Sequence, residues 1–458
     1  MGTKTARLDD RIRFGEKAAF ALGNFGSIPI MSLISSFLLL FYTDVVGLNP
    51  ASVATLFLIS RLLDGLNDPI MGYIIDHLPR TKLGRFRTYM LIGTVLVCIN
   101  YVLLWFGPAW ATTGKMVVAY ISYLLIGITF DIKDIPQNSL IPVMTDKENE
   151  RSSLSAIKGM CYVLGGMVFA VGAPMLLDNM GMTLEAFYVL IFGTVAIVLM
   201  TTIINVAGVR ERIEPIDQDA KYRISDLFKF VLAAPVFSTF LATLFFGIAV
   251  SISSTSNVYF FIYVLDNQLD IMGITSMLQM LGLLPAILFS GLLVKGLGKK
   301  GTFVVGLLLA GLGPLIRLLS ITSIPLLHVS NILMGAGLGL ITTLMYSIGA
   351  DNVDYIEYQY GQRAEGALAS LSSFVAKAGQ GIGGAVAGYV LAATGYIASQ
   401  AQSRQAVSGI IANVVVLPGI ISLVACVIFI FGYKISKSKV TEITEELRAR
   451  REAGAAKE

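Results

Sequence analysis

The chain of 458 residues is poor in charge, cysteine and histidine. Only 14% of its residues are charged, whereas a soluble domain carries roughly 25%. Its three cysteines, Cys98, Cys161 and Cys426, lie in apolar segments without disulfide or zinc spacing. No Ser/His, Cys/His or metal-ligand cluster suggests an enzyme, and no cofactor is expected. The net charge of +4 gives no reason to expect a nucleic-acid partner.

Long apolar runs take the place of the missing charge. Hydrophobic residues make up 55% of the chain, and the mean hydropathy is +0.74. A helix that crosses a bilayer needs roughly 20 mainly apolar residues, and barrel strands would instead alternate over about ten. We predict an all-α polytopic membrane protein with about twelve transmembrane helices, at residues 18–43, 52–76, 88–107, 116–142, 153–177, 187–208, 237–264, 272–294, 302–320, 324–349, 366–394 and 409–433.

Basic residues gather on alternate sides of the predicted spans. They occur in the N-terminal tail, after span two, in the central loop, after span eight and in the C-terminal tail, whereas the intervening loops hold only Lys115 and Arg404. The positive-inside rule therefore predicts that both termini are cytoplasmic and that the protein lies in the cell's inner (plasma) membrane, surrounded by lipid. Trp105 and Trp110 fall at the outer end of span three, where an aromatic belt is expected.

A polar stretch at 209–225 divides the chain into two similar parts. The predicted organisation is an N-terminal six-helix bundle over 1–208, a cytoplasmic central loop with a short interfacial helix over 209–236, a C-terminal six-helix bundle over 237–433 and a charged cytoplasmic tail over 434–458. Two parallel six-helix halves are the arrangement of a major facilitator transporter. We expect the tail to form no more than a solvated helix. Gly379–Gly384 matches a dinucleotide fingerprint, but inside an apolar span it favours close helix packing instead.

Acidic residues inside the spans are costly and therefore suggest function. Asp64 and Asp68 share one face of span two, with Asn67 and Arg61 beside them. Asp131 of span four falls at a similar depth of about 20 Å when residues are counted from the outer side. Pro136, near the end of that span, lets the helix bend or open there.

Carboxylate and amide oxygens at one depth suit a hard monovalent cation or a shared proton. The alternative interpretation is that the intramembrane acids are only paired with the intramembrane bases Arg61, Lys133, Lys158 and Lys377.

Several motifs in order resemble one known family. They are FYTDVVGLNPASVATLFLISRLLDGLNDPIMGYIID at 41–76, and further segments at 134–154, 350–366 and 374–381. The whole chain resembles the glycoside–pentoside–hexuronide:cation symporters. The resemblance implies a major facilitator fold that carries a sugar or glycoside by alternating access, coupled to Na⁺, Li⁺ or H⁺. A transporter of a lysolipid or another amphipathic solute with the same fold remains the alternative.

The resemblance also implies residue roles. Asp64, Asn67 and Asp68 match the family's cation-binding positions on helix two, and Asp131 replaces the threonine that completes that site. The ion is therefore left open between sodium and a proton.

For the substrate, Asp134 and Lys377 match sugar-binding positions, whereas Ser27 and Ile28 replace a lysine–aspartate pair and Asn138 replaces a tryptophan. Lys158 lies one position before the family's helix-five arginine. Lys133, Lys158 and Lys377 suit an anionic hexuronide, or they are committed to the aspartates.

The cytoplasmic segments suggest a gate. Asp76 and Arg80 follow span two in the loop motif of the superfamily. A second set resembles the family's cytoplasmic loop after helix ten, whose charge pairs form in one conformation and break in the other; it comprises Asp351, Asp354, Tyr355 and Arg363. A solvated loop is the plain alternative.

Overall fold

The computed structural model describes residues 12–77, 79, 81, 83–145, 148–212, 229–361 and 365–455. Over these ranges the chain is helical, and its only β-type pairing is the isolated bridge between Thr81 and Gly84. Only the first three residues, 226–228, of the interfacial helix predicted at 226–237 lie outside the described residues; 229–232 and 234–237 are helical. Of the predicted site residues, Arg80 and Arg363 also lie outside, as do the side chains of Asp68 and Asp76.

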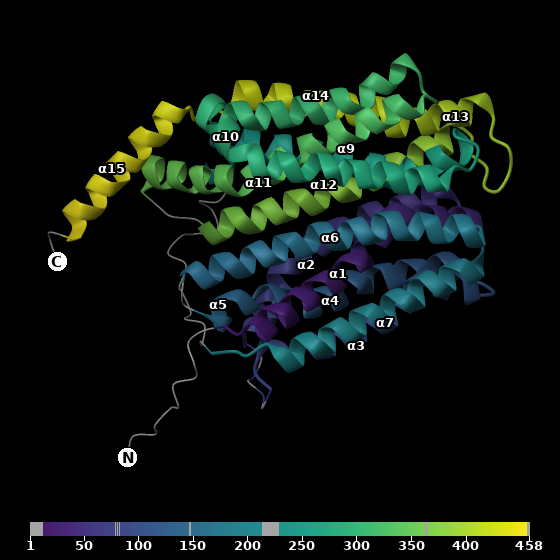
Figure 1. The fold of residues 1–458 in the computed structure, drawn as a ribbon, viewed down its shortest axis with the longest axis horizontal. Helices are drawn as coiled ribbons and strands as arrows, with labels where there is room; N and C mark the ends of the chain where they lie inside the picture. Colours follow the sequence, from purple (N-terminus) through teal and green to yellow (C-terminus); the bar gives the residue numbers. More distant parts are fainter. Residues whose placement is uncertain are drawn as a thin grey trace. The chain divides into compact units, whose positions relative to one another are not determined.

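The helices follow the predicted apolar runs (Figure 1). The first part of the chain forms α1 Phe14–Leu40, a π-helical turn Phe41–Val45, α2 Pro50–His77, α3 Phe86–Trp110, α4 Lys115–Asn138, α5 Leu140–Met144, α6 Glu148–Met180 and α7 Leu184–Gly208. The second part forms α9 Ala234–Tyr263, α10 Leu269–Leu315 with a 3-10 turn Ile316–Leu319, α11 Ile324–Tyr360, α12 Glu365–Ala393, α13 Arg404–Ile411, a π-helical turn Ala412–Val416, α14 Leu417–Gly432 and α15 Lys437–Ala455.

In the described part of the chain, nine helices are long and apolar enough to cross a membrane. One of them, α10, covers two predicted spans, which meet at Gly298, where φ is 70° and the helical conformation is interrupted. Helices α2 and α12 cover two more predicted spans but carry charged residues. The chain is therefore a multi-pass membrane protein, and its number of crossings stays a prediction.

Two compact units divide the chain, and the division cuts through α1 and α2. Unit 1 comprises Met1–Ile34 with Leu66–Gln218, and unit 2 comprises Ser35–Gly65 with Asp219–Glu458. The apolar core of unit 1 includes Phe20 of α1, Phe86 and Met90 of α3 and Leu140 of α5. One apolar core of unit 2, among the described residues, is built from α9, α10, α11, α14 and α15.

Glycines of α12 pack against its neighbours within unit 2, as predicted from Gly379–Gly384. A Cβ atom on Gly383 would lie 2.6 Å from the carbonyl oxygen of Ile248 in α9. On another side of α12, a Cβ atom on Gly388 would lie 2.7 Å from the Cβ atom of Ala54 in α2. The prediction of close packing through small residues is confirmed, because a larger side chain at these positions has no room.

The C-terminal helix α15 is docked, so the expectation of a merely solvated tail is wrong. Ile443 and Leu447 are only 2% and 4% exposed and belong to the core of unit 2. The Arg450 guanidinium donates a hydrogen bond to the carbonyl oxygen of Tyr358 at 3.1 Å. The physical reason is spacing: apolar residues three and four positions apart form one helix face that can be buried.

Candidate functional site

Asp64 is held between two basic side chains within unit 2. Its Oδ2 atom lies 3.2 Å from the Lys377 ammonium and 3.6 Å from the Arg61 guanidinium. The side chain is only 8% exposed. Among the described residues, its buried Oδ1 atom has no hydrogen-bond partner. A buried carboxylate oxygen without a described donor is unusual, because such oxygens are generally hydrogen-bonded.

Small residues bring α12 close enough to α2 for this contact. A Cβ atom on Gly65 would lie 2.8 Å from the Phe374 ring, and one on Gly381 would lie 2.5 Å from the Cβ atom of Arg61. The helices can therefore pack with little between them, and Lys377 reaches Asp64. The pairing predicted as the alternative to an ion site is thus present, while Oδ1 is left available to a proton or cation.

Asn67 and Asp131 form a second polar pair, within unit 1. The Asn67 side-chain amide donates to Asp131 Oδ2 at 3.1 Å, and Asp131 is 5% exposed. Two residues farther along α4, Lys133 is fully buried and donates to the Ser27 hydroxyl of α1. Helix α4 stays helical through Pro136 and ends at Asn138, so it does not open at Pro136 as the sequence had suggested.

Glycine explains the burial of Lys133. A Cβ atom on Gly93 of α3 would lie 2.5 Å from the backbone nitrogen of Lys133, so α3 packs directly on the α4 backbone. The close packing leaves the ammonium inside the unit, where it needs a hydrogen-bond acceptor such as Ser27.

Asp134, Asn138 and Lys158 form a chain of polar contacts in unit 1. Asn138 donates to Asp134 Oδ2 at 2.7 Å, as expected for residues four apart on a helix. Lys158 of α6 donates to the Asn138 side-chain oxygen. These three predicted substrate residues are therefore brought together, and they offer both donors and acceptors to a hydroxylated ligand. Lys377 belongs to unit 2, where it contacts Asp64.

The predicted cytoplasmic loop after helix ten is helical. Helix α11 continues to Tyr360, so Asp351, Asp354 and Tyr355 lie on a helix rather than in a solvated loop. Asp351 is 7% exposed and accepts from the Lys299 ammonium at 2.6 Å. Tyr355 packs against the core of unit 2. The extension past 349 was missed because it is polar, and its stability comes from packing on other helices.

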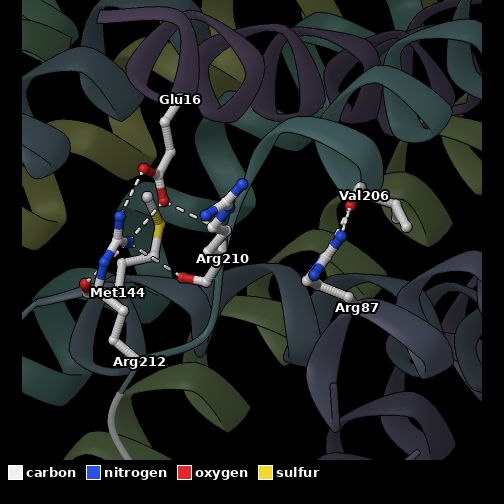
Figure 2. A network of polar contacts seen from close by, with 6 residues as sticks. All are labelled: Glu16, Arg87, Met144, Val206, Arg210 and Arg212. Atoms are coloured by element: carbon white, nitrogen blue, oxygen red, sulfur yellow. Dashed lines mark hydrogen bonds and ion pairs between the residues drawn. The ribbon is translucent and has the colours of Figure 1, made fainter. Parts of the chain in front are cut away.

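Two further polar clusters were not found from the sequence, and Figure 2 shows the first, in unit 1. Glu16, 7% exposed, accepts from both terminal nitrogens of Arg212 at 2.7 and 2.8 Å and from the backbone N–H of Arg210 at 3.1 Å. Arg87 donates to the carbonyl oxygen of Val206. These bonds tie the segment after α7 to α1, and the last turn of α7 to α3. The basic residues involved had served in the sequence only to orient the chain.

The second cluster surrounds Asp44 at the end of the π-helical turn in unit 2. The Tyr263 hydroxyl donates to Asp44 Oδ1 at 2.6 Å, and the Tyr396 hydroxyl lies 2.7 and 2.8 Å from the two carboxylate oxygens. Thr43 donates to Oδ2 at 2.6 Å. The sequence feature that could have indicated this cluster is an acidic residue in the apolar run FYTDVVG.

Comparisons with known proteins identify the family. The model of the MFS/sugar transport protein family matches residues 19–437. The isoprimeverose transporter of Lactiplantibacillus pentosus is 31% identical, over 93% of this chain and 90% of its own length. The glucuronide carrier protein homolog of Escherichia coli is 30% identical, over 94% and 95%.

Solved structures support the fold alone, because their sequence identity is low. The nucleoside transporter NupG matches with a TM-score of 0.64 at 12% identity, over 92% of this chain and 100% of that chain. A bacterial homologue of the iron transporter ferroportin, in an inward-facing state, matches with a TM-score of 0.64 at 16% identity, over 93% and 100%. The chain therefore belongs to the MFS/sugar transport protein family, in its glycoside–pentoside–hexuronide branch, and is a membrane transporter of a small-molecule substrate rather than an enzyme.

Proposed function

We propose that this transporter is a symporter that carries a sugar or glycoside by alternating access, driven by a monovalent cation, Na⁺ or H⁺. The observation that carries the proposal is Asp64: a carboxylate in a membrane helix, one oxygen held by Lys377 and Arg61, the other buried without a described partner. An ion pair with a purely structural role does not require the second carboxylate oxygen to lack a hydrogen-bond donor.

Two of the predicted cation-binding residues, both on α2, make separate polar contacts. Asp64 contacts Lys377 in unit 2, and three residues later Asn67 contacts Asp131 in unit 1. The carboxylates of Asp64 and Asp131 and the side-chain oxygen of Asn67 are ligands that hard cations prefer, and the Lys377 ammonium would take the place of the cation at Asp64. Li⁺ fits the same chemistry as Na⁺. Asp68 completes the set by its match to the family.

For the substrate, the relatives' names include isoprimeverose and glucuronide, a neutral and an acidic sugar derivative. Asp134, Asn138 and Lys158 offer hydrogen-bond partners to sugar hydroxyls, and the Ser27–Lys133 pair lies on α1 and α4 of the same unit. The basic residues favour an acidic sugar, since guanidinium and ammonium groups bind carboxylates strongly. We place the protein in the inner (plasma) membrane with cytoplasmic termini.

Gradient-driven uptake tests this function. Purified protein in liposomes is given an inward Na⁺ gradient, an inward H⁺ gradient, both or neither, with a neutral pentoside, a hexuronide or a lysolipid outside. We expect concentrative uptake of a sugar or hexuronide with one gradient and none when both are collapsed. Uptake that ignores both gradients contradicts the coupling, and uptake of lysolipid alone contradicts the substrate class.

Variants locate the coupling site. Asp64→Asn should abolish concentrative uptake, whereas Asp178→Asn, a change of an exposed acid on α6, should preserve it. Lys377→Gln removes the competing base, so less Na⁺ should suffice to occupy Asp64 in a thermal-shift titration. A higher Na⁺ requirement in Lys377→Gln, or normal coupling in Asp64→Asn, contradicts the assignment.

A further inference from the structure

A small cavity lies in unit 2 beside the start of α15. Its volume is about 340 Å³, enough for a compact polar group. It lies where α14 has ended, α15 begins and α9 begins, and it is lined by Ala234, Pro235, Tyr355, Lys434, Ile435, Ser436, Ser438, Lys439 and Glu442. None of these residues belongs to the proposed cation or sugar positions; Tyr355 is the one that the sequence had suggested as part of a gate.

The charges around the cavity leave one cation without an acid. Lys439 donates to Glu442 at 2.5 Å, so these two opposite charges offset each other. Nearby on α11, Asp351 is already paired with Lys299. Lys434 is exposed and makes no hydrogen bond or ion pair in the described part of the chain. The hydroxyls of Ser436, Ser438 and Tyr355 add possible donors, and the first turn of α15 adds the positive end of a helix.

The position along the chain puts this cavity at the edge of the membrane. The apolar span Arg404–Gly432 ends two residues before Lys434. Tyr433 and Ile435, on either side of Lys434, are 1% and 3% exposed and fix the segment to the core of unit 2. Lys434 is thereby held at the level where lipid headgroups lie, instead of on a mobile tail.

We propose that this cavity binds the phosphate of an anionic phospholipid from the adjacent leaflet. The phosphate oxygens would accept hydrogen bonds from the Lys434 ammonium and from one serine hydroxyl, since the Ser436 and Ser438 hydroxyls share a hydrogen bond at 2.9 Å, while the acyl chains remain in the bilayer beside α14. A lipid is favoured over a free phosphate because the site adjoins the end of a membrane helix, where lipid phosphates are concentrated. The inference is independent of the proposed function, since binding is measured without transport.

Thermal unfolding of the purified protein in a neutral, delipidated detergent tests the site. Short-chain phosphatidylglycerol should raise the melting temperature in a saturable way, and phosphatidylcholine of the same chain length and inorganic phosphate should not. Lys434→Gln should weaken the apparent affinity for phosphatidylglycerol about fivefold, the effect of one lysine near an anionic lipid, and Lys434→Arg should retain it.

The matched control is Lys437→Gln, which removes an equal charge three residues away, at the first position of α15, from a lysine that does not line the cavity. It should change the affinity less than twofold. An equal loss in Lys437→Gln would show diffuse attraction to basic residues rather than a site. Equal stabilisation by phosphatidylcholine or by inorganic phosphate, or unchanged affinity in Lys434→Gln, would also overturn the proposal.

Discussion

The carboxylate of Asp44 is expected to fix the end of α1 to the rest of unit 2. Tyr263 and Tyr396 both donate to it, from α9 and from the segment after α12, at distances of 2.6 to 2.8 Å. A hydrogen bond to a charged group contributes roughly 1.5–3 kcal/mol. Tyr263→Phe and Tyr396→Phe each remove one phenolic donor with little change of volume, so each should lower the free energy of unfolding by about 2 kcal/mol.

Tyr389→Phe is the matched control. The Tyr389 hydroxyl contacts the Thr55 hydroxyl at 2.8 Å, also in unit 2, but neither group is charged and Tyr389 is 41% exposed. Its loss should cost about 0.5 kcal/mol, the low end for a neutral pair. Denaturant-induced unfolding in detergent micelles, followed by far-ultraviolet circular dichroism because both tryptophans lie on α3 in unit 1, compares the three variants under one condition.

The double variant makes the test sharper. Tyr263 and Tyr396 share Asp44 Oδ1, so their effects should not add: the second substitution acts on a carboxylate that has already lost a donor. We expect a coupling energy of about 1 kcal/mol in the double-mutant cycle. Simple additivity would mean that the two tyrosines act separately. A cost for Tyr263→Phe no larger than that of Tyr389→Phe would refute the role given to Asp44.

Three other predictions concern packing and the tail. Gly383→Val places atoms against the α9 backbone and should cost about 1–3 kcal/mol, whereas Gly193→Ala, with nothing within 4 Å of the added Cβ, should be neutral or stabilising; thermal unfolding separates them. Leu447→Ala should cost about 2–3 kcal/mol of the free energy that holds α15 against unit 2, and should therefore make α15 more sensitive to limited proteolysis. Unchanged cleavage would contradict the docking of α15. The hydrogen bond between Lys439 and Glu442 raises the pKa of Lys439 and lowers the pKa of Glu442. The protection of α15 from proteolysis should therefore not change with pH between the two pKa values. It should fall when the pH drops through the lowered pKa of Glu442, and it should also fall when the pH rises through the raised pKa of Lys439. Protection that rises at either extreme contradicts this pairing.

The helices were predictable because apolar runs of membrane length have few other solutions. The intramembrane acids were predictable for the same reason, since each stands out against its apolar neighbours. The contact of Asp134 with Asn138, four residues later on α4, was not predicted, although the spacing of the two residues permits it. Most of the correct predictions from the sequence therefore came from local periodicity and from the cost of placing a charge in lipid.

Long-range partners could not be predicted from one sequence. Trp105 was expected in an interfacial belt, but it is fully buried and stacks on Phe187 of α7 with ring centroids 5.7 Å apart. Trp110, five residues later, is 51% exposed as a belt residue would be. Both fit the same sequence pattern and both contact α7, since Trp110 donates to the Tyr188 hydroxyl at 2.9 Å; only the packing around each ring distinguishes them. Asp44 is similar, because its donors Tyr263 and Tyr396 are more than 200 residues away.

The pair formed by Asp64 and Lys377 explains why the sequence left two interpretations of the intramembrane charges. At 3.2 Å, and with an effective dielectric constant of about 20, opposite unit charges attract by about 5 kcal/mol before either is desolvated. This attraction is large enough to hold Lys377 against Asp64. The desolvation of both charges offsets much of it, so a cation or proton can compete with Lys377 for the carboxylate. Under the proposed function, the Asp64 carboxylate is therefore paired with Lys377 in one state and binds the coupling cation or proton in the other. The Oδ1 atom, which has no described donor, is the atom that would bind the cation or proton.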